Sequence, residues 1–204
     1  MTAEEVHQVL EAATQINEFA ALALRLAAET GARRSELAAL SWDSLVNDRL
    51  VIDRQVTLVV DADGKKVPTI RPTKTGSRRA VALGASTLAM VQGLADKWAH
   101  LTVWMFSPDT PPPNPDRIGW WWKRSRTISG IDKKWRLHDL RHWSATHAIA
   151  SGADIRTVAN RLGHADPSMT LRVYSHAVEA LDHALANDLG SALDSTRGLS
   201  HGRT

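Results

Sequence analysis

The 204-residue sequence contains no cysteine and only one tyrosine. The absence of cysteine excludes disulfide bonds, thiolate nucleophiles and zinc sites built on cysteine, and it is consistent with a reducing compartment. The sequence also lacks a run of about 18 apolar residues, the length that a membrane-spanning helix needs. With 43% hydrophobic and 23% charged residues, the composition predicts one soluble globular domain with a core of ordinary size.

The amino terminus lacks the basic and then apolar pattern of a secretion signal. Its first five residues, Met1 to Glu5, are acidic instead, and Thr2 and Glu5 have the spacing of a helix capping box. We therefore expect a cytoplasmic protein with one folded domain over residues 1–193. The last segment, from Asp194 to Thr204, is predicted to be a disordered tail.

Positive charge exceeds negative charge by only 3, but the positive residues are clustered. A first cluster begins at Lys65, contains no acid, and ends with Arg78 and Arg79. A second cluster, from Arg117 to Arg141, includes three cations on one expected helix, namely Lys123, Arg124 and Arg126. Each cluster alone is typical of a solvated surface, but two clusters in one domain favour contacts with nucleic acid. We therefore predict that Arg78, Arg79 and the three helix cations contact DNA.

Three consecutive tryptophans, Trp120 to Trp122, precede the helix cations. Successive residues of a helix are about 100° apart, so the three rings cannot all face the core. At least one of them is predicted to be exposed or to meet a partner.

Hydrophobic periodicity predicts a chain that is mainly helical, with one β-rich segment. Strands are expected over 50–52, 56–60, 67–71 and 78–83, with a turn at Asp61–Gly64, and together they predict one small antiparallel sheet. Helices are expected over 3–30, 33–40, 85–100, 115–128, 137–151, 154–162, 167–174 and 178–193. The predicted fold class is α+β, mainly α-helical with a small antiparallel β-sheet.

The single tyrosine, Tyr174, follows a segment rich in histidine and arginine. Taken alone, a lone tyrosine can be a half-buried packing residue with a wet hydroxyl. His138 and Arg141, three residues apart, are expected on one helix face. A guanidinium beside an imidazole suits phosphate oxygens, although Arg141 could equally form a salt bridge with Asp139 or another acid.

Two further histidines belong to the same segment. His138 and His142 have the spacing of metal ligands, but without cysteine or a nearby acidic ligand the sequence disfavours zinc. His164 lies between Gly163, which has the position of a helix C-cap, and Asp166, which has the position of the next N-cap. We therefore expect the His164 side chain to face a site from a tight loop.

Five short motifs occur in a fixed order along the chain: Thr30 to Leu37, Lys74-Thr75-Gly76, His138 to His142, Leu162-Gly163-His164 and Tyr174-Ser175-His176. Together they resemble the catalytic domain of the tyrosine recombinases, the phage integrase family, from about Thr2 to about Leu193. The resemblance implies six catalytic residues, which are Arg33, Lys74, His138, Arg141, His164 and Tyr174. Two features depart from the family pattern. Trp143 stands where a small or hydroxyl residue is common, and the long hairpin before Lys74 leaves Lys65 and Lys66 as rivals for its role.

The resemblance implies a definite chemistry. Tyr174 would attack a DNA phosphodiester and form a 3′-phosphotyrosyl bond, while Lys74 would protonate the leaving 5′ oxygen. The two arginines and His164 would stabilise the negative charge, so no metal, ATP or other cofactor is implied. Two other classes stay open at this point: a type IB topoisomerase with a similar active site, and a DNA-binding relative without activity.

The implied partner is double-stranded DNA at a recombination site, and no membrane partner is expected. Apolar residues recur every three or four positions near the carboxyl terminus: Val178, Leu181, Leu185, Leu189 and Leu193. Because recombinases of this kind pass a C-terminal helix to a neighbouring subunit, we expect a DNA-dependent homotetramer, although the stripe could also fold back on its own domain. Such recombinases usually carry an N-terminal DNA-clamping domain, so we expect a shortened or minimal relative that binds its site weakly.

Overall fold

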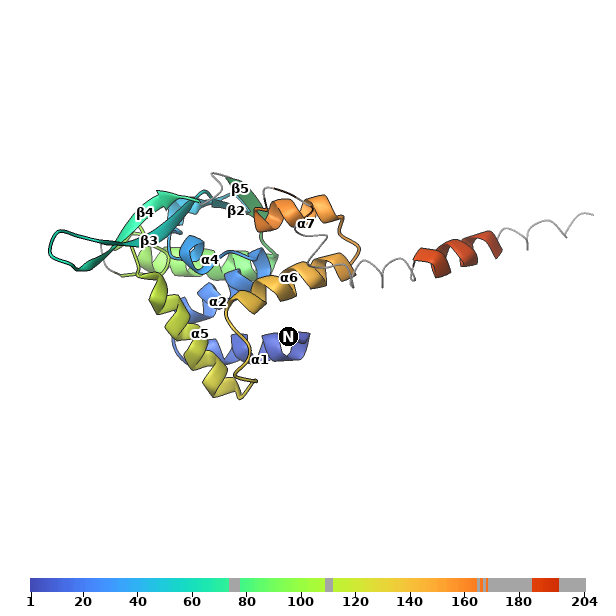
Figure 1. Cartoon of the computed structure of the whole chain (residues 1–204), viewed down its shortest axis with the longest axis horizontal. Helices are drawn as coiled ribbons and strands as arrows, with labels where there is room; N and C mark the ends of the chain where they lie inside the picture. The colour runs from blue at the N-terminus through green and yellow to red at the C-terminus, as the bar shows by residue number, and fades with distance from the viewer. Residues whose placement is uncertain (74–77, 109–111, 165, 167, 169–184, 195–204) are drawn as a thin grey trace, which may run out of the picture.

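The computed structural model describes residues 1–73, 78–108, 112–164, 166, 168 and 185–194. Its helices are α1 (Ala3–Thr14), α2 (Glu18–Thr30), α3 (Arg34–Leu37), α4 (Ala85–Trp98), α5 (Pro115–Ser129), α6 (His138–Ala150) and α7 (Ile155–Leu162), with a 3₁₀ turn η1 (Trp42–Ser44). Its strands are β1 (Leu45–Val46), β2 (Arg49–Ile52), β3 (Arg54–Val60), β4 (Lys66–Pro72) and β5 (Arg79–Ala82). The predicted α+β class, mainly helical with antiparallel strands, is confirmed (Figure 1).

The amino-terminal segment forms two helices and not the single helix predicted over residues 3–30. The Asn17 side chain accepts a hydrogen bond from the Ala20 amide at 2.8 Å and so starts α2. The predicted capping box at the start of α1 is confirmed, because the Thr2 hydroxyl accepts from the Glu5 amide and the Glu5 carboxylate accepts from the Thr2 amide. The cap at Asn17 therefore starts a new helix, although apolar residues continue at helical spacing through both helices.

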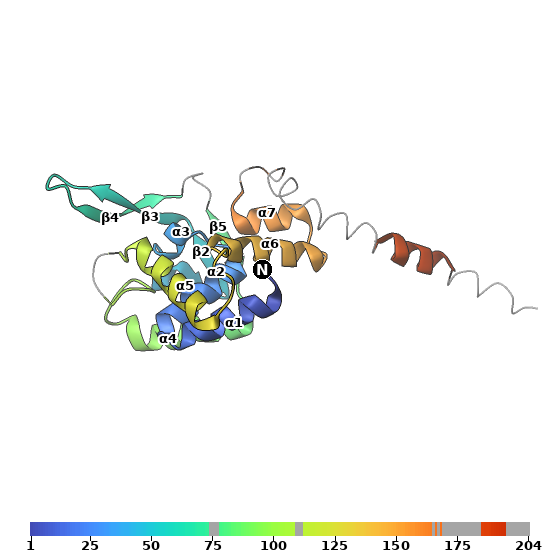
Figure 2. The same ribbon diagram turned by 60° about the horizontal axis from the view of Figure 1, so that its bottom comes forward.

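The strands form two antiparallel sheets and not one. β1, β2 and β5 make a three-stranded sheet in the order β1-β2-β5, while β3 and β4 pair only with each other. The β3–β4 hairpin turns at Asp61–Gly64, as predicted, and extends from one end of the body in both ribbon views (Figures 1 and 2). β5 then returns to the body and pairs with β2, with Arg79 opposite Ile52.

The core is built around α2, which packs against α1, α4, α5 and α6. Its leucines Leu22, Leu24 and Leu26 are fully buried. On α5, Trp121 and Trp122 are buried whereas Trp120 is 56% exposed, which confirms the expectation for the three tryptophans. A smaller apolar cluster joins α6 to α7. The hydrogen bond from Arg141 to the Gly31 carbonyl and the packing of Leu162 against Gly31 hold the carboxyl end of α2, the first turns of α6 and the end of α7 close together.

The carboxyl-terminal region is described only in part. Residues 185–194 are helical, in agreement with the end of the predicted helix, whereas the predicted helix over 167–174 and the predicted tail lie almost wholly outside the described residues. Leu185, Leu189 and Leu193 are 55%, 55% and 71% exposed. In both views this helix stands apart from the body (Figures 1 and 2). No helix in the described ranges has the length and hydropathy needed to cross a membrane.

Candidate active site

Arg33 lies at the start of α3, directly after the left-handed turn that ends α2. Gly31 is the C-cap of α2 and has φ of 64°, a conformation that glycine adopts without strain. The turn places the Arg33 side chain, which is 37% exposed, at the surface. Its Nη1 atom contacts the Glu36 carboxylate at 2.9 Å, and its backbone amide donates to the same carboxylate. Arg33 is therefore oriented by a buried acid and still accessible to a substrate.

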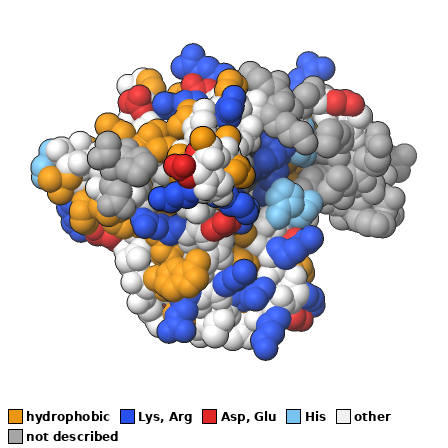
Figure 3. All heavy atoms as spheres, turned by 60° about the vertical axis from the view of Figure 1, so that its left-hand side comes forward, with side chains coloured by type: hydrophobic (Ala, Val, Ile, Leu, Met, Phe, Trp, Pro, Cys, Tyr) orange, Lys and Arg blue, Asp and Glu red, His pale blue; other side chains and the backbone are white. Residues whose placement is uncertain are grey.

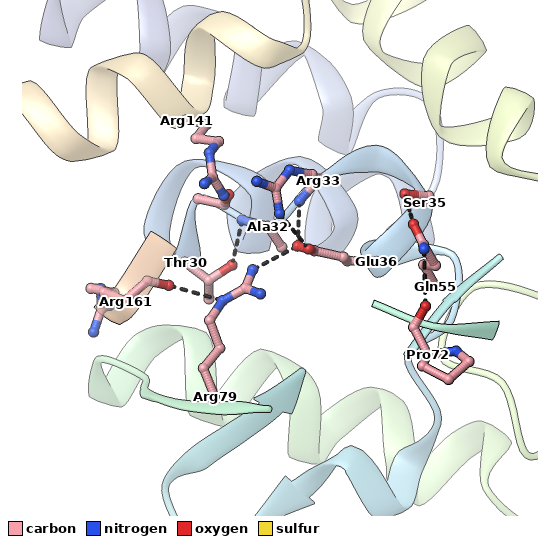
Figure 4. A network of polar contacts seen from close by, with 11 residues as sticks. Thr30, Ala32, Arg33, Ser35, Glu36, Gln55, Pro72, Arg79, Arg141 and Arg161 are labelled. Carbon is pink, nitrogen blue, oxygen red and sulfur yellow. Dashed lines mark hydrogen bonds and ion pairs between the residues drawn. The ribbon is translucent and has the colours of Figure 1, made fainter. Parts of the chain in front are cut away.

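Arg141 reaches the same turn from α6. Its Nη1 atom donates to the Gly31 carbonyl oxygen at 2.6 Å, and the residue is 3% exposed. Asp139 instead accepts a hydrogen bond from the Arg136 amide at 2.6 Å and has the Arg136 guanidinium within 3.6 Å. The acid considered as a salt-bridge partner for Arg141 is thus engaged by Arg136. In Figure 4 the guanidinium groups of Arg141 and Arg33 lie on the same side of the turn.

The two histidines come from α6 and from the loop after α7. His138 is the first residue of α6, is exposed, and meets the ring of His142 edge to face at 4.9 Å between centroids. Gly163 ends α7 in a left-handed conformation, as predicted, and the His164 amide that follows donates to the Ala159 carbonyl at 3.0 Å. His164 is thereby fixed in the loop and half-buried.

The charges around the histidines indicate that the cationic residues form one site. Burial, and after it the charges of Arg141, Arg33, Arg79 and His138, lowers the pKa of His164 to about 4. Although His138 is exposed by surface area, partial desolvation of its ring, and after it the charges of His142, Arg141 and Arg33, lower its pKa. Both imidazoles are therefore held in the neutral form near pH 7, when each can donate one hydrogen bond and accept another. The structure thus brings together four of the six predicted catalytic residues, Arg33, His138, Arg141 and His164.

Two of the six predicted residues, Lys74 and Tyr174, lie outside the described residues. Their roles stay predictions. The rivals of Lys74 lie at the far end of the β3–β4 hairpin, where Lys65 ends the turn and Lys66 begins β4, both exposed.

The predicted DNA-contacting cations differ in exposure. Lys123, Arg124 and Arg78 are exposed. Arg126 is partly buried, and its Nη1 atom donates to the carbonyl oxygens of Lys133 and Trp135, both at 2.8 Å. It therefore ties the loop before α6 to α5, and its guanidinium is already engaged within the protein.

Arg79 does not fit the expectation of a surface cation. Its side chain is 6% exposed and forms a 2.6 Å ion pair with Glu36, whose side chain is 2% exposed. Its Nε and Nη2 atoms donate hydrogen bonds within the protein, and Nη1 is buried without a hydrogen-bond partner among the described residues, so the guanidinium lies in the interior and not on the exposed surface. Neither Glu36 nor this role of Arg79 was identified from the sequence, although Glu36 follows Arg33 at the spacing of a capping interaction.

The candidate active site is continuous with the positive surface of α5. A hollow of about 310 Å³ lies between them, and its lining includes Arg33, Trp122, Lys123, Arg126 and His138. In Figure 3, Lys and Arg side chains lie within and below a recess beside which histidine side chains are exposed. Anions at the site and along this surface would meet the same positive field. Within the described ranges, no group of three His, Cys, Asp or Glu side chains could hold a metal ion.

Comparison with known proteins agrees with this arrangement. The sequence model of the phage integrase family matches residues 1–180. Tyrosine recombinase XerD of Caulobacter vibrioides is 31% identical over 188 residues, which cover 88% of this chain and 58% of the relative. Tyrosine recombinase XerC of Alcanivorax borkumensis is 30% identical over 181 residues, covering 85% and 54%. The chain thus spans a little over half the length of these relatives.

Solved structures share the fold at lower identity. The Tn1549 transposon integrase in complex with transposon right end DNA has a TM-score of 0.75 and 18% identity, covering 91% of this chain and 65% of that one. XerA recombinase has a TM-score of 0.69 and 21% identity, covering 89% and 63%. A lambda integrase tetramer bound to a Holliday junction has a TM-score of 0.61 and 22% identity, covering 85% and 47%. By the match of its sequence to the family model, this chain belongs to the phage integrase family.

Proposed function

We propose that residues 1–193 form the catalytic domain of a site-specific DNA recombinase with Tyr174 as its nucleophile. The observation that carries this proposal is the convergence of two guanidiniums and two imidazoles around the turn that ends α2. Arg141 binds the Gly31 carbonyl, Arg33 and His138 line one hollow, and the end of α7, which precedes His164, packs against Gly31. Such a set suits a phosphodiester in which negative charge builds up on the non-bridging oxygens. The family to which the chain belongs supports the same chemistry.

In the proposed reaction, the Tyr174 hydroxyl oxygen attacks the phosphorus of a DNA phosphodiester. The bond from phosphorus to the 5′ oxygen breaks, and a 3′-phosphotyrosyl bond replaces it. Lys74 gives a proton to the leaving 5′ oxygen, while the Tyr174 proton passes to a nearby base, for which neutral His138 is suited. With an ordinary pKa near 10, only about a thousandth of a tyrosine is ionised at pH 7, so this proton transfer and the nearby arginines both matter.

The two arginines and His164 stabilise the negative charge of the reacting phosphate. Arg33 and Arg141 neutralise the phosphate and its developing negative charge, and neutral His164 donates a hydrogen bond to a non-bridging oxygen. These groups can provide the electrostatic stabilisation that a metal ion provides in other phosphoryl-transfer enzymes. The covalent intermediate conserves the energy of the phosphodiester, so attack by a 5′-hydroxyl of another strand rejoins the DNA without ATP.

Double-stranded DNA is the proposed partner, bound along the positive surface of α5 and at Arg78. We also propose that the helix at residues 185–194 contacts a neighbouring subunit in a DNA-dependent tetramer. The exposure of Leu185, Leu189 and Leu193 supports this, because an apolar stripe of this length is normally covered. A head-to-tail contact of this kind can close four subunits into a ring.

A nicked suicide substrate tests the proposed function. The DNA fragment beyond the nick diffuses away after cleavage, so a covalent adduct accumulates and can be mapped by proteolysis and mass spectrometry. We expect the adduct at Tyr174, the only tyrosine in the chain. Tyr174→Phe should abolish the adduct and leave DNA binding within about twofold, because it removes a single hydroxyl.

The same assay separates the other classes. Persistence of the adduct in Tyr174→Phe would refute the nucleophile assignment. An adduct combined with relaxation of supercoiled DNA and no strand exchange would favour a topoisomerase, and DNA binding with no adduct would favour a DNA-binding relative without activity.

A further inference from the structure

Arg79 contacts each of two segments that carry a candidate catalytic residue, although its own side chain is only 6% exposed. It begins β5, so it also anchors the strand that follows Lys74 in the sequence. Its contacts connect the end of the hairpin segment with α3 and with the end of α7 (Figure 4).

The first contact leads to Arg33 through Glu36. One carboxylate oxygen of Glu36 accepts from Arg79 Nη2 at 2.6 Å and from the Arg33 amide at 2.9 Å, and the other lies 2.9 Å from Arg33 Nη1. Burial alone would raise the pKa of the Glu36 carboxyl, but the hydrogen bond and charge of Arg79, together with Arg33, lower it below its ordinary value. Glu36 is therefore ionised and binds both guanidiniums at once.

The second contact leads to the His164 loop. Arg79 Nε donates to the Arg161 carbonyl oxygen in the last turn of α7 at 3.0 Å. The guanidinium also packs beneath Gly163, because a Cβ atom built on that residue would lie 2.8 Å from Arg79 Nη1. His164 follows directly, so the loop that presents it is supported by the Arg79 side chain.

We propose that Arg79 is a positioning residue that sets the geometry of Arg33 and His164 relative to each other. This inference rests on the proposed function for its catalytic consequence. Arg79 acts through Glu36 and through the end of α7, and makes no contact with the reacting phosphate. Arginine is required because its donors point in different directions and reach two acceptors at once, whereas the single ammonium of lysine is a point charge without this fork.

The conservative variant Arg79→Lys tests this role. We expect the rate constant of adduct formation at saturating DNA to fall by at least tenfold, with the dissociation constant for DNA changed by less than threefold. Arg54→Lys is the matched control, because Arg54 also forms ion pairs, with Asp43 and Asp53, but is not part of the candidate site. The control should keep its cleavage rate within twofold.

A second measurement does not depend on cleavage. The pKa of the His164 imidazole can be followed by NMR, and in the native protein it is lowered to about 4 by burial and then by the charges of Arg141, Arg33, Arg79 and His138. Arg79→Lys keeps the charge, so a rise of this pKa by one unit or more would report that the loop has moved. Arg54→Lys should leave it unchanged.

Loss of fold is controlled by a double variant. Arg79→Met leaves the buried Glu36 carboxylate without that partner and could unfold the domain, so it is combined with Glu36→Gln, which removes the buried charge. The folded double variant should show the same loss of cleavage as Arg79→Lys.

The outcomes separate the two proposals. If the native chain forms no adduct, the proposed function fails, and the His164 titration still decides the role of Arg79. If Arg79→Lys keeps both the native cleavage rate and the native His164 pKa, or if cleavage falls only in proportion to the unfolded fraction, then Arg79 stabilises the fold and does not position the site.

Discussion

Gly31 offers the sharpest test of how the turn at the candidate active site is built. Replacing it by alanine adds a single methyl group at a residue whose φ is 64° and whose carbonyl oxygen binds Arg141. A Cβ atom at this position would closely overlap Leu162 Cδ2 and would lie 3.4 Å from Arg141 Cγ. Leu162 is only 1% exposed, so its side chain cannot swing into solvent to relieve the clash.

The expected loss of stability has two parts. A left-handed conformation costs a residue other than glycine roughly 1–2 kcal/mol. Overpacking against buried side chains adds roughly 1–3 kcal/mol. The total of roughly 2–5 kcal/mol is a large fraction of the 5–15 kcal/mol that is typical of a folded domain, so Gly31→Ala should be strongly destabilised or unfolded.

Gly130→Ala is the matched control. Gly130 is also the left-handed C-cap of a helix, with φ of 72°, but a Cβ atom added there would have open space around it, with no contact within 4 Å. Both variants share the backbone cost and the gain from a stiffer unfolded chain, so these terms cancel in the comparison. The excess loss in Gly31→Ala, about 1–3 kcal/mol, isolates the close approach of α6 and α7 to the turn.

Urea unfolding followed by tryptophan fluorescence measures both variants on the same scale. Equal losses for Gly31→Ala and Gly130→Ala would refute the close packing at the turn. Gly31→Ala should also slow adduct formation in its folded fraction, because the methyl group pushes against Arg141, whereas Gly130→Ala should not.

The remaining predictions concern DNA and assembly. Replacing Lys123 and Arg124 together by alanine should lower the slope of log affinity against log salt by roughly two, about one for each lost phosphate contact, whereas Lys97→Ala on α4 should leave the slope unchanged. An unaltered slope in the double variant would place the DNA elsewhere. Leu189→Glu should weaken DNA-dependent oligomers in sedimentation, whereas the control Ser191→Glu should not. The two variants should have the same monomer stability. Equal assembly of the two variants would refute the proposed interface.

Local signals in the sequence predict most of the helices. The spacing of Thr2 from Glu5 identifies a cap, and helix geometry requires the consecutive tryptophans to divide between the core and the surface. The break between α1 and α2 escapes such reasoning because apolar residues continue at helical spacing across it. A single side chain, that of Asn17, satisfies the free amides at the start of α2 and ends the continuity.

The division of the strands into two sheets depends on contacts that periodicity does not report. Each strand has a β-like pattern of its own, but the choice of partner is made by the ends of the strands. The Thr73 amide donates to the Asp53 carbonyl at 3.2 Å and closes the β3–β4 hairpin, after which β5 pairs with β2. The pairing of strands that are far apart in the sequence, such as β2 and β5, is decided by tertiary packing.

In the candidate site, too, some residues are predictable from short motifs, whereas others depend on partners that are distant in the sequence. Arg33, Arg141, His138 and His164 are predictable from short motifs because each motif places its residue at a helix end or on one helix face. Arg79 is predicted to be a surface cation because it belongs to a run of positive charge. Its partner Glu36 lies 43 positions earlier in the sequence, so nothing near Arg79 signals that it is buried.

The energetics of that pair give a reason to connect it with function. Removing two charges from water costs several kcal/mol for each ion, and their mutual attraction often does no more than compensate for this, so a buried ion pair is weak evidence for stability. An apolar pair of similar volume would hold β5 against α3 at least as well. It would not hold Arg33 through a shared carboxylate or support the loop before His164. We therefore infer that the geometry that Glu36 and Arg79 impose contributes to the alignment of the candidate catalytic groups, which the His164 titration in Arg79→Lys measures directly.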